Sequence, residues 1–153
     1  MKMSDKLRGF LTVLFVIYLG ALVYGLFFAT QLGRTQELEH GVNLVPFTEI
    51  FRFWKGPESL GNSQFWYNVV GNIAVFVPLG FFTALLLRRR YYGAFALAVT
   101  YIVSLVAELL QYFLKVGTFD IDDVILNTFG GLLGILIAAA IRKKNDVHGR
   151  RAR

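Results

Sequence analysis

Cysteine is absent from this chain of 153 residues, which excludes disulfides, thiolate metal sites and cysteine nucleophiles. Histidine occurs only twice, as His40 and His148, far apart and in polar segments. A histidine-based zinc site would need ligands that the sequence does not hold, so zinc is not expected. Charged residues make up only 17% of the chain, against about 25% in a soluble domain. So little charge argues against a soluble domain.

Hydrophobic residues, in contrast, account for 56% of the sequence. They gather in long runs at about residues 10–31, 66–87, 91–114 and 122–141. Each run has about 20 residues, the length with which an α-helix crosses a hydrocarbon core of about 30 Å. The first run could instead be a cleaved signal peptide, but it exceeds the usual apolar length and no cleavage motif follows. The sequence therefore predicts an all-α fold, a transmembrane four-helix bundle in a single domain over residues 1–153.

Basic residues alternate between the connections of this bundle. Most of the 16 lysines and arginines lie before the first run, in the triple arginine at 88–90 and after the last run. Basic residues mark cytoplasmic segments, so both termini and the loop at 88–90 are predicted to be cytoplasmic. The net charge of +6 is then explained by topology and by attraction to anionic membrane lipids. No nucleic-acid partner is predicted.

Polar side chains interrupt the last three apolar runs in pairs with helical spacing. The pairs are Asn68 and Asn72, Glu108 and Gln111, and Asp123 and Asn127. Spacings of three or four residues put both members of a pair on one helix face. At a rise of about 1.5 Å per residue, Asn72, Glu108 and Asn127 share one depth about 9 Å below the outer rim. Since unpaired polar groups are costly in hydrocarbon, the three helices are predicted to turn these faces toward one another.

The buried carboxyls carry the strongest functional signal, because acids inside a membrane are rare and usually functional. Glu108 is expected to be protonated or hydrogen-bonded by amide groups, and Asp123 lies one turn nearer the surface. The structural alternative is that these groups only link helices, through hydrogen bonds of about 0.6–2 kcal/mol each. For Asn68 and Gln111 taken alone, that alternative stays open.

The connection between the first two runs contains a second amphipathic pattern. Its apolar residues recur at helical spacing at Phe47, Ile50, Phe51 and Trp54, directly after Pro46. Proline is favoured in the first turn of a helix. We therefore predict a short helix over about residues 46–55, lying in the outer membrane interface.

At these residues the chain resembles the VanZ-like family of small bacterial membrane proteins. The matching segments are Asn43–Phe47, Asn68, Gly71–Asn72, Phe76–Gly80, Glu108, Gln111, Phe119–Asp123 and Asn127–Gly130. The resemblance covers about residues 40–135. One departure is Thr118, where the family is expected to have an arginine nearby, before its acidic stretch. If that arginine holds an anionic substrate, this chain does so differently or not at all.

The resemblance implies a polytopic protein of the bacterial plasma membrane. The founding member of the family is associated with resistance to teicoplanin, a glycopeptide that engages cell-wall precursors outside the membrane. The leading hypothesis is a membrane module that binds or acts on a lipid-linked envelope component at the outer leaflet. The candidate polar site comprises Asn43, Asn68, Asn72, Glu108, Gln111, Asp120, Asp123 and Asn127.

In this hypothesis the amides hold a polar headgroup, and the acids bind it, transfer protons or hold a divalent ion. Oxygen ligands suit Mg²⁺ or Ca²⁺ and not zinc. Whether there is catalysis is left open, because no serine or cysteine is placed as a nucleophile; Ser104 is interpreted as a helix-packing hydroxyl. The alternatives are a structural or adaptor protein, and a transporter or proton channel. Against transport, the inner halves of the runs lack ionisable residues, although oligomerisation could build a polar path.

Overall fold

The computed structural model describes residues 4–29, 41–48, 51, 63–87 and 91–151. Four helices within these ranges are long and apolar enough to cross a membrane. They are Asp5–Phe28, Asn68–Leu86, Tyr92–Phe113 and Ile121–Lys144. The predicted all-α class with four spanning helices is confirmed, with the ends displaced by a few residues.

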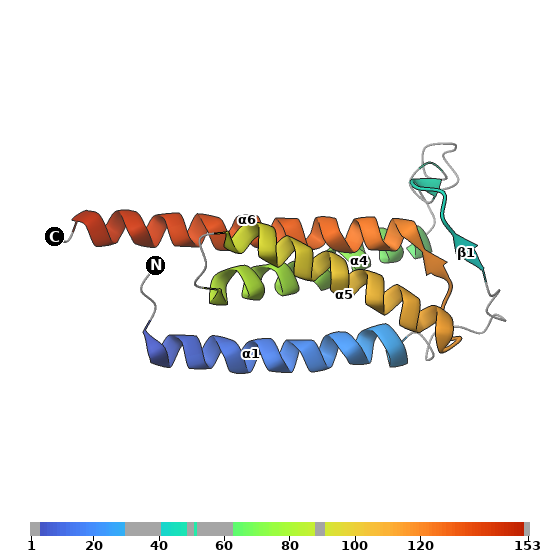
Figure 1. Ribbon diagram of the computed structural model, residues 1–153, viewed down its shortest axis with the longest axis horizontal. Coiled ribbons are helices and arrows are strands. Elements are labelled where there is room, and N and C mark those ends of the chain that lie inside the picture. Colours follow the sequence, from blue (N-terminus) through green and yellow to red (C-terminus); the bar gives the residue numbers. More distant parts are fainter. Residues whose placement is uncertain (1–3, 30–40, 49–50, 52–62, 88–90, 152–153) are drawn as a thin grey trace.

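The elements follow one another as long helices joined by short irregular segments. In chain order they are α1 (Asp5–Tyr24), the π-helix η1 (Gly25–Ala29), β1 (Val42–Asn43), α4 (Ser63–Leu86), α5 (Tyr92–Phe113), β2 (Phe119–Asp120) and α6 (Ile121–Arg151). Figure 1 shows the helices running along one common axis, with both chain termini at one end of the bundle. The strands β1 and β2 lie at the other end. This antiparallel order brings the start of α4, the end of α5 and the start of α6 to the same end of the bundle.

The last helix continues past the predicted end at residue 141 to Arg151, because the lysines and arginines that follow favour helix and no proline interrupts them. The predicted interfacial helix at 46–55 lies mostly outside the described residues. Within the described part, the amide of Phe51 donates to the carbonyl of Phe47 at 2.8 Å, as in one helical turn. The rest of that helix stays a prediction.

Glycines bring α4 and α6 into backbone contact at the centre of the bundle. A Cβ atom added to Gly130 would lie 2.1 Å from the carbonyl oxygen of Ile73. One added to Gly134 would lie 2.0 Å from that of Val77. Small residues allow helices in a membrane to approach this closely, and packing then holds them together. The pair α4–α6 is therefore the centre of the fold, and α5 packs against it.

The first helix packs more loosely than the others. Only 6% of its most apolar window is buried, against 44% for α6. It contacts α4 through Leu22, which lies in a cluster with Phe76 and Leu79, and through Tyr18. The Tyr18 hydroxyl donates to the carbonyl of Val75 at 2.7 Å, one turn before Pro78, which lies inside α4. This loose attachment leaves room between α1 and the rest of the bundle.

Candidate functional site

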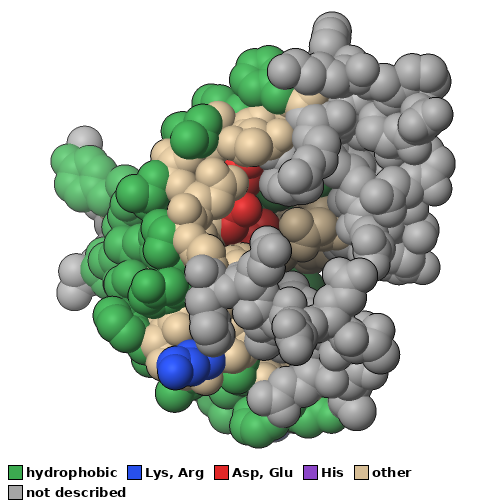
Figure 2. Space-filling model, turned by 90° about the vertical axis from the view of Figure 1, so that its right-hand side faces the viewer, with side chains coloured by type: hydrophobic (Ala, Val, Ile, Leu, Met, Phe, Trp, Pro, Cys, Tyr) green, Lys and Arg blue, Asp and Glu red, His purple; other side chains and the backbone are tan. Residues whose placement is uncertain are grey.

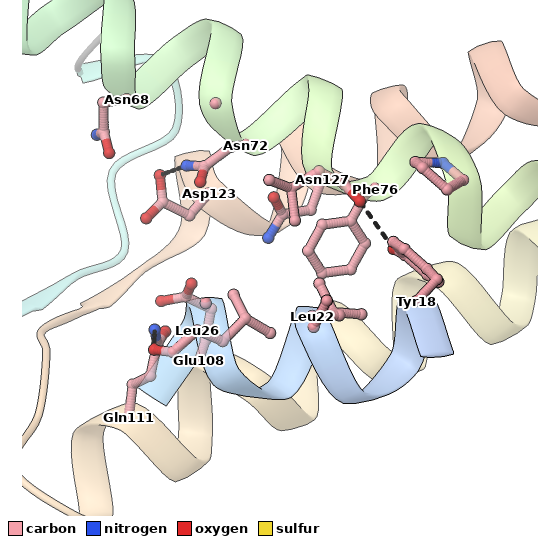
Figure 3. Close-up of a pocket in the computed structure, with 15 residues that line it drawn as sticks. Tyr18, Leu22, Leu26, Asn68, Asn72, Phe76, Glu108, Gln111, Asp123 and Asn127 are labelled. Carbon is pink, nitrogen blue, oxygen red and sulfur yellow. Dashed lines mark hydrogen bonds between the residues drawn. The ribbon is translucent and has the colours of Figure 1, made fainter. Parts of the chain in front are cut away.

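A cavity of about 400 Å³ lies between α1, α4, α5 and α6. Figure 2 views the molecule from the end that carries the strands and shows acidic side chains at the centre of this face, next to backbone and uncharged polar side chains, with hydrophobic groups farther out. The residues that line the cavity are Tyr18, Ala21, Leu22, Gly25, Leu26, Asn68, Gly71, Asn72, Val75, Phe76, Pro78, Glu108, Gln111, Asp123 and Asn127. The polar members lie mainly toward the strand end, and the apolar ones lie deeper (Figure 3).

Six of the eight candidate residues line this cavity. They are Asn68, Asn72, Glu108, Gln111, Asp123 and Asn127. The helices α4, α5 and α6 thus turn their polar faces inward, as the pair spacing predicts. The other two candidates, Asn43 and Asp120, lie on the adjoining strands. The structure therefore gathers the candidates at one end of the bundle.

The hydrogen bonds between the helices do not follow the depths that the sequence predicts for the polar residues. Counting residues put Asn72 level with Asn127, but the Asn72 amide donates to the carboxylate of Asp123. Asn127 instead donates to the Ser104 hydroxyl of α5 at 2.9 Å. The register is displaced by about one helical turn, because the end of an apolar run does not fix how neighbouring helices are staggered. Ser104 is fully buried, so its hydroxyl serves helix packing and also anchors Asn127.

Glu108 is buried and also accepts a hydrogen bond from the backbone. Its side chain is only 3% exposed, and its Oε2 accepts a hydrogen bond from the amide of Asp120 at 3.1 Å. This meets one of the two sequence-based expectations for Glu108, a hydrogen bond from an amide group. The carboxyls of Asp120 and Asp123 are close enough to act on Glu108 electrostatically. Glu108 is therefore the buried acid on which both aspartates act.

The short strands fix the backbone beside the cavity. Strands β1 and β2 pair in parallel, with Asn43 opposite Asp120. The Asn43 amide donates to both carboxylate oxygens of Asp120 at 3.2 Å. Asp120 also accepts from the amide of Asp122 at 2.8 Å, which makes it the N-cap of α6. Asn43 and Asp120 thus fix the backbone next to the cavity, but they do not line it.

Asp122 also holds the backbone beside the cavity, although it is not among the eight candidate residues. It is 1% exposed, and its carboxylate accepts from the backbone amide of Phe47. Phe47 has a φ of 66°, an unusual conformation for a non-glycine residue. A buried acid in the first turn of α6 also interacts favourably with the helix dipole. Asp122 therefore ties the segment after β1 to the start of α6.

The sequence interpretation missed the contribution of α1 to the cavity. Tyr18, Ala21, Leu22, Gly25 and Leu26 face it from α1 and η1. Their spacing is helical, but only Tyr18 carries a polar side-chain group, so a search for polar residues could not find them. The Gln111 amide donates to the carbonyl of Leu26 at 2.8 Å, which satisfies a carbonyl near the end of this helix.

Comparison with known proteins agrees with this arrangement. The family model VanZ/LLP1 matches residues 15–142, a range that includes all the candidate residues. The chain belongs to the VanZ/LLP1 family. Protein VanZ of Enterococcus faecium is 29% identical over 126 residues, covering 80% of this chain and 69% of that protein. No solved structure matches this chain. The resemblance inferred from the sequence motifs is therefore confirmed.

Membership of the VanZ/LLP1 family, together with four spanning helices, makes this a multi-pass membrane protein whose outer helix surfaces contact lipid. Many large apolar side chains are accordingly exposed on the bundle, such as Phe10, Ile17 and Ile102. In water such surface would be unfavourable, whereas lipid chains solvate it.

The divalent-ion hypothesis gains no geometric support in this VanZ/LLP1 member. Among the residues that the structure describes, no three acidic or histidine side chains lie together as metal ligands would. The acids instead accept hydrogen bonds from backbone and amide groups. The chemistry that the described site offers is hydrogen bonding and charge, next to an apolar wall.

Proposed function

We propose that this VanZ/LLP1 protein binds the headgroup of a lipid-linked envelope component at the outer leaflet of the bacterial plasma membrane. Binding would in turn affect susceptibility to teicoplanin. The observation that supports the proposal is that the two ends of the cavity differ in polarity. Glu108 and Asp123 lie toward the strands, and Leu22 and Phe76 lie deeper in the bundle (Figure 3). A molecule with a polar head and a hydrocarbon chain matches both ends, because polar groups need partners and alkyl chains do not.

The outer-leaflet part of the proposal rests on charge. Glu108 and Asp123 line the cavity (Figure 3), and Asp120 next to them belongs to the strand pair, which lies at the end of the bundle opposite the termini (Figure 1). The sequence has its basic segments before the first spanning helix, between the second and third, and after the last. By the positive-inside rule, the termini face the cytoplasm and the cavity faces outward.

A labelling experiment tests this orientation directly, since the chain has no native cysteine to react. Leu44→Cys places a thiol at an exposed position beside β1, and Lys143→Cys places one at an exposed position near the other end. In intact cells, an impermeant thiol reagent is expected to label the first variant and to label the second only after lysis. The opposite pattern would refute an outward-facing cavity.

The binding role is tested by changing the two lining acids without changing their shape. In a strain whose teicoplanin susceptibility depends on this protein, Glu108→Gln and Asp123→Asn are each expected to abolish the phenotype, because an amide cannot supply the same charge and acceptor capacity. Membrane abundance, measured by immunoblot, should stay within about twofold of wild type. Asp5→Asn, the same chemical change at the other end of the bundle, is the control and should keep the phenotype. Full activity in both cavity variants would contradict the proposal.

One observation favours a second candidate, a structural or adaptor protein. The bonds Asn72–Asp123, Asn127–Ser104 and Gln111–Leu26 each join two different elements. Such bonds would fasten the bundle even if no ligand entered. In that case Glu108→Gln would be tolerated, and any loss of phenotype in other variants would follow their loss of abundance.

A further inference from the structure

We propose that residues 18–26, which join α1 to η1, are a gate that opens the cavity sideways to the membrane and admits the hydrocarbon chain of a lipid. The inference rests on the proposed binding function and deepens it by naming the route of entry and the residues that control it. Three observations carry it. The other walls of the cavity are locked together, α1 is packed more loosely, and two hydrogen bonds hold residues 18–26 beside the cavity.

Helices α4, α5 and α6 are locked together by close contacts at glycines and by a buried hydrogen bond. A Cβ atom added to Gly80 of α4 would lie 2.0 Å from the carbonyl oxygen of Gly131 in α6. One added to Gly131 would lie 2.3 Å from Cγ2 of Thr100 in α5, a side chain that is fully buried. Asn127 of α6 also donates to Ser104 of α5 at 2.9 Å. Close-packed interiors resist deformation, so these three helices form the fixed walls of the cavity.

The glycines of α1 and η1 make no contact of this kind. A Cβ atom added to Gly9, Gly20 or Gly25 would meet nothing within 4 Å. The helix packs mainly on α4, and its contact with α5 is made mainly by η1. Leu22 and Leu26 belong to this wall of the cavity (Figure 3). At its glycines the wall can therefore move without separating closely packed backbones.

Two hydrogen bonds hold this wall in place, one to α4 and one to α5. The Tyr18 hydroxyl donates to the carbonyl of Val75 in α4 at 2.7 Å. Eight residues later, the carbonyl of Leu26 accepts from the amide of Gln111 in α5 at 2.8 Å. All four residues line the cavity. Hydrogen bonds between helices in a membrane are individually weak. A closed state held in this way is in equilibrium with an open one, whose population a ligand can raise.

The half of α1 nearer the N-terminus is anchored differently and would serve as the pivot. Phe15 stacks on Phe82 of α4 with ring centroids 5.5 Å apart. Leu11 packs against the apolar cluster that includes Ala84 and Ala138. Beyond the gate, the chain continues into the π-helix η1, and π-helical turns are frequently found at functional sites. Residues 18–26 can therefore tilt while the rest of α1 keeps its contacts.

A lateral opening suits a lipid better than entry from the strand end. Glu108 and Asp123 lie toward the strands, and Leu22 and Phe76 lie deeper in the bundle (Figure 3). A hydrocarbon chain that entered past the acids would leave an apolar environment for a polar one, which is unfavourable. A chain that enters between α1 and α5 passes from lipid directly to the apolar end of the cavity. Phospholipids and polyprenyl lipids both offer such a chain.

Spin labels test the movement in the full chain, which has no native cysteine to interfere. Val23→Cys on α1 and Val106→Cys on α5 place labels at exposed positions that do not line the cavity. Their distances are measured by double electron–electron resonance in lipid nanodiscs. The double variant Tyr18→Phe, Gln111→Met removes both donors and keeps the side chains similar in size. It is expected to raise the population of longer distances at least about threefold, the factor for one lost hydrogen bond of average strength in a membrane.

Two controls separate gate opening from a general loosening of the bundle. Tyr24→Phe removes a hydroxyl from an exposed side chain of the same helix and should leave the distances between Val23→Cys and Val106→Cys unchanged. Labels at Val106→Cys and Phe129→Cys report on α5 and α6, and their distances should not change in the double variant. Unchanged α1–α5 distances in the double variant, or an equal change between α5 and α6, would overturn the inference.

Photolabelling tests whether a chain enters. The nanodiscs contain either a phosphatidylcholine or a polyprenyl phosphate with a diazirine in its chain, and labelled residues are located by mass spectrometry. Phe76 is fully buried and lines the cavity, whereas Ile102 is exposed and reports on the surrounding lipid. Labelling of Phe76 relative to Ile102 should rise at least about threefold in the double variant Tyr18→Phe, Gln111→Met. A rise with one lipid only identifies the chain that enters, and no rise with either lipid contradicts the gate.

The gate and the binding site can fail separately. If both gate tests fail while Glu108→Gln and Asp123→Asn still abolish the susceptibility phenotype, the proposed function stands and the ligand enters by another route. If the gate tests succeed while those two variants keep the phenotype, lateral entry stands and the proposed role of the acids fails.

Discussion

Gly134→Ala is expected to disrupt the contact between α4 and α6 and to prevent the bundle from reaching its native packing. The added methyl group would lie 2.0 Å from the carbonyl oxygen of Val77 and 2.7 Å from the amide nitrogen of Phe81. These are backbone atoms of a continuous helix, so no side-chain rotation can relieve the overlap. The two helices must separate, which costs packing along their whole contact. Overpacking typically costs about 1–3 kcal/mol, and an overlap with backbone atoms belongs at the upper end of that range.

The same reasoning applies to Gly130→Ala, whose methyl group would overlap the carbonyl of Ile73. Both variants should show reduced membrane abundance and a lower midpoint of thermal unfolding in detergent, followed by circular dichroism. Gly20→Ala in α1 is the matched control, since nothing lies within 4 Å of the added methyl group. Alanine favours helix over glycine by about 1 kcal/mol, so this control should unfold at the wild-type temperature or slightly above it. Equal thermal stability of Gly134→Ala and Gly20→Ala would show that the backbones are not in contact there.

Asp122→Ala is expected to release the segment at residues 41–48 from the start of α6. The substitution removes the acceptor of the Phe47 amide and a favourable charge in the first turn of the helix. Hydrogen bonds to a charged group contribute about 1.5–3 kcal/mol, so a loss of about 2 kcal/mol in local stability is expected. Asp120 pairs with Asn43 across the strands, and its amide donates to Glu108. The backbone that holds the Glu108 carboxyl should therefore become more mobile as well.

Hydrogen–deuterium exchange measured by mass spectrometry checks this expectation. Peptides covering residues 41–48 should exchange faster in Asp122→Ala than in wild type, while peptides from the centre of α6 should not change. Asp122→Asn keeps an oxygen acceptor of the same shape and should show a smaller effect. Unchanged exchange at 41–48 in Asp122→Ala would mean that other contacts hold the segment.

Much of the candidate site could be predicted because its signal is local. In a chain of low charge, each polar residue inside an apolar run is conspicuous, and its spacing from the next one identifies the helix face. This reasoning placed Asn68, Asn72, Glu108, Gln111 and Asn127 on inward faces, and all of them line the cavity. The family resemblance rested on the same residues and was confirmed by comparison.

The pairing partners could not be predicted in the same way. Asn72 is hydrogen-bonded to Asp123 and does not lie at the depth of Asn127. The stagger of α4 against α6 decides this, and it is set by the close contacts of Gly130 and Gly134 with backbone carbonyls of α4. No count of residues from the end of an apolar run contains that information. The strand pair was also missed, since β1 and β2 have only two residues each and show no alternating pattern.

By itself the sequence determined the class of the protein, its four spanning helices and the helix faces that turn inward. These follow from hydrophobicity and from the 3.6-residue helical period, which act over a few turns of one helix. Only the tertiary structure decided that α1 closes the cavity with apolar residues, that Asp122 holds the neighbouring segment, and that the Asn127 amide donates to Ser104 of α5. Those features depend on the stagger and distance between helices, which arise from packing among residues far apart in the chain.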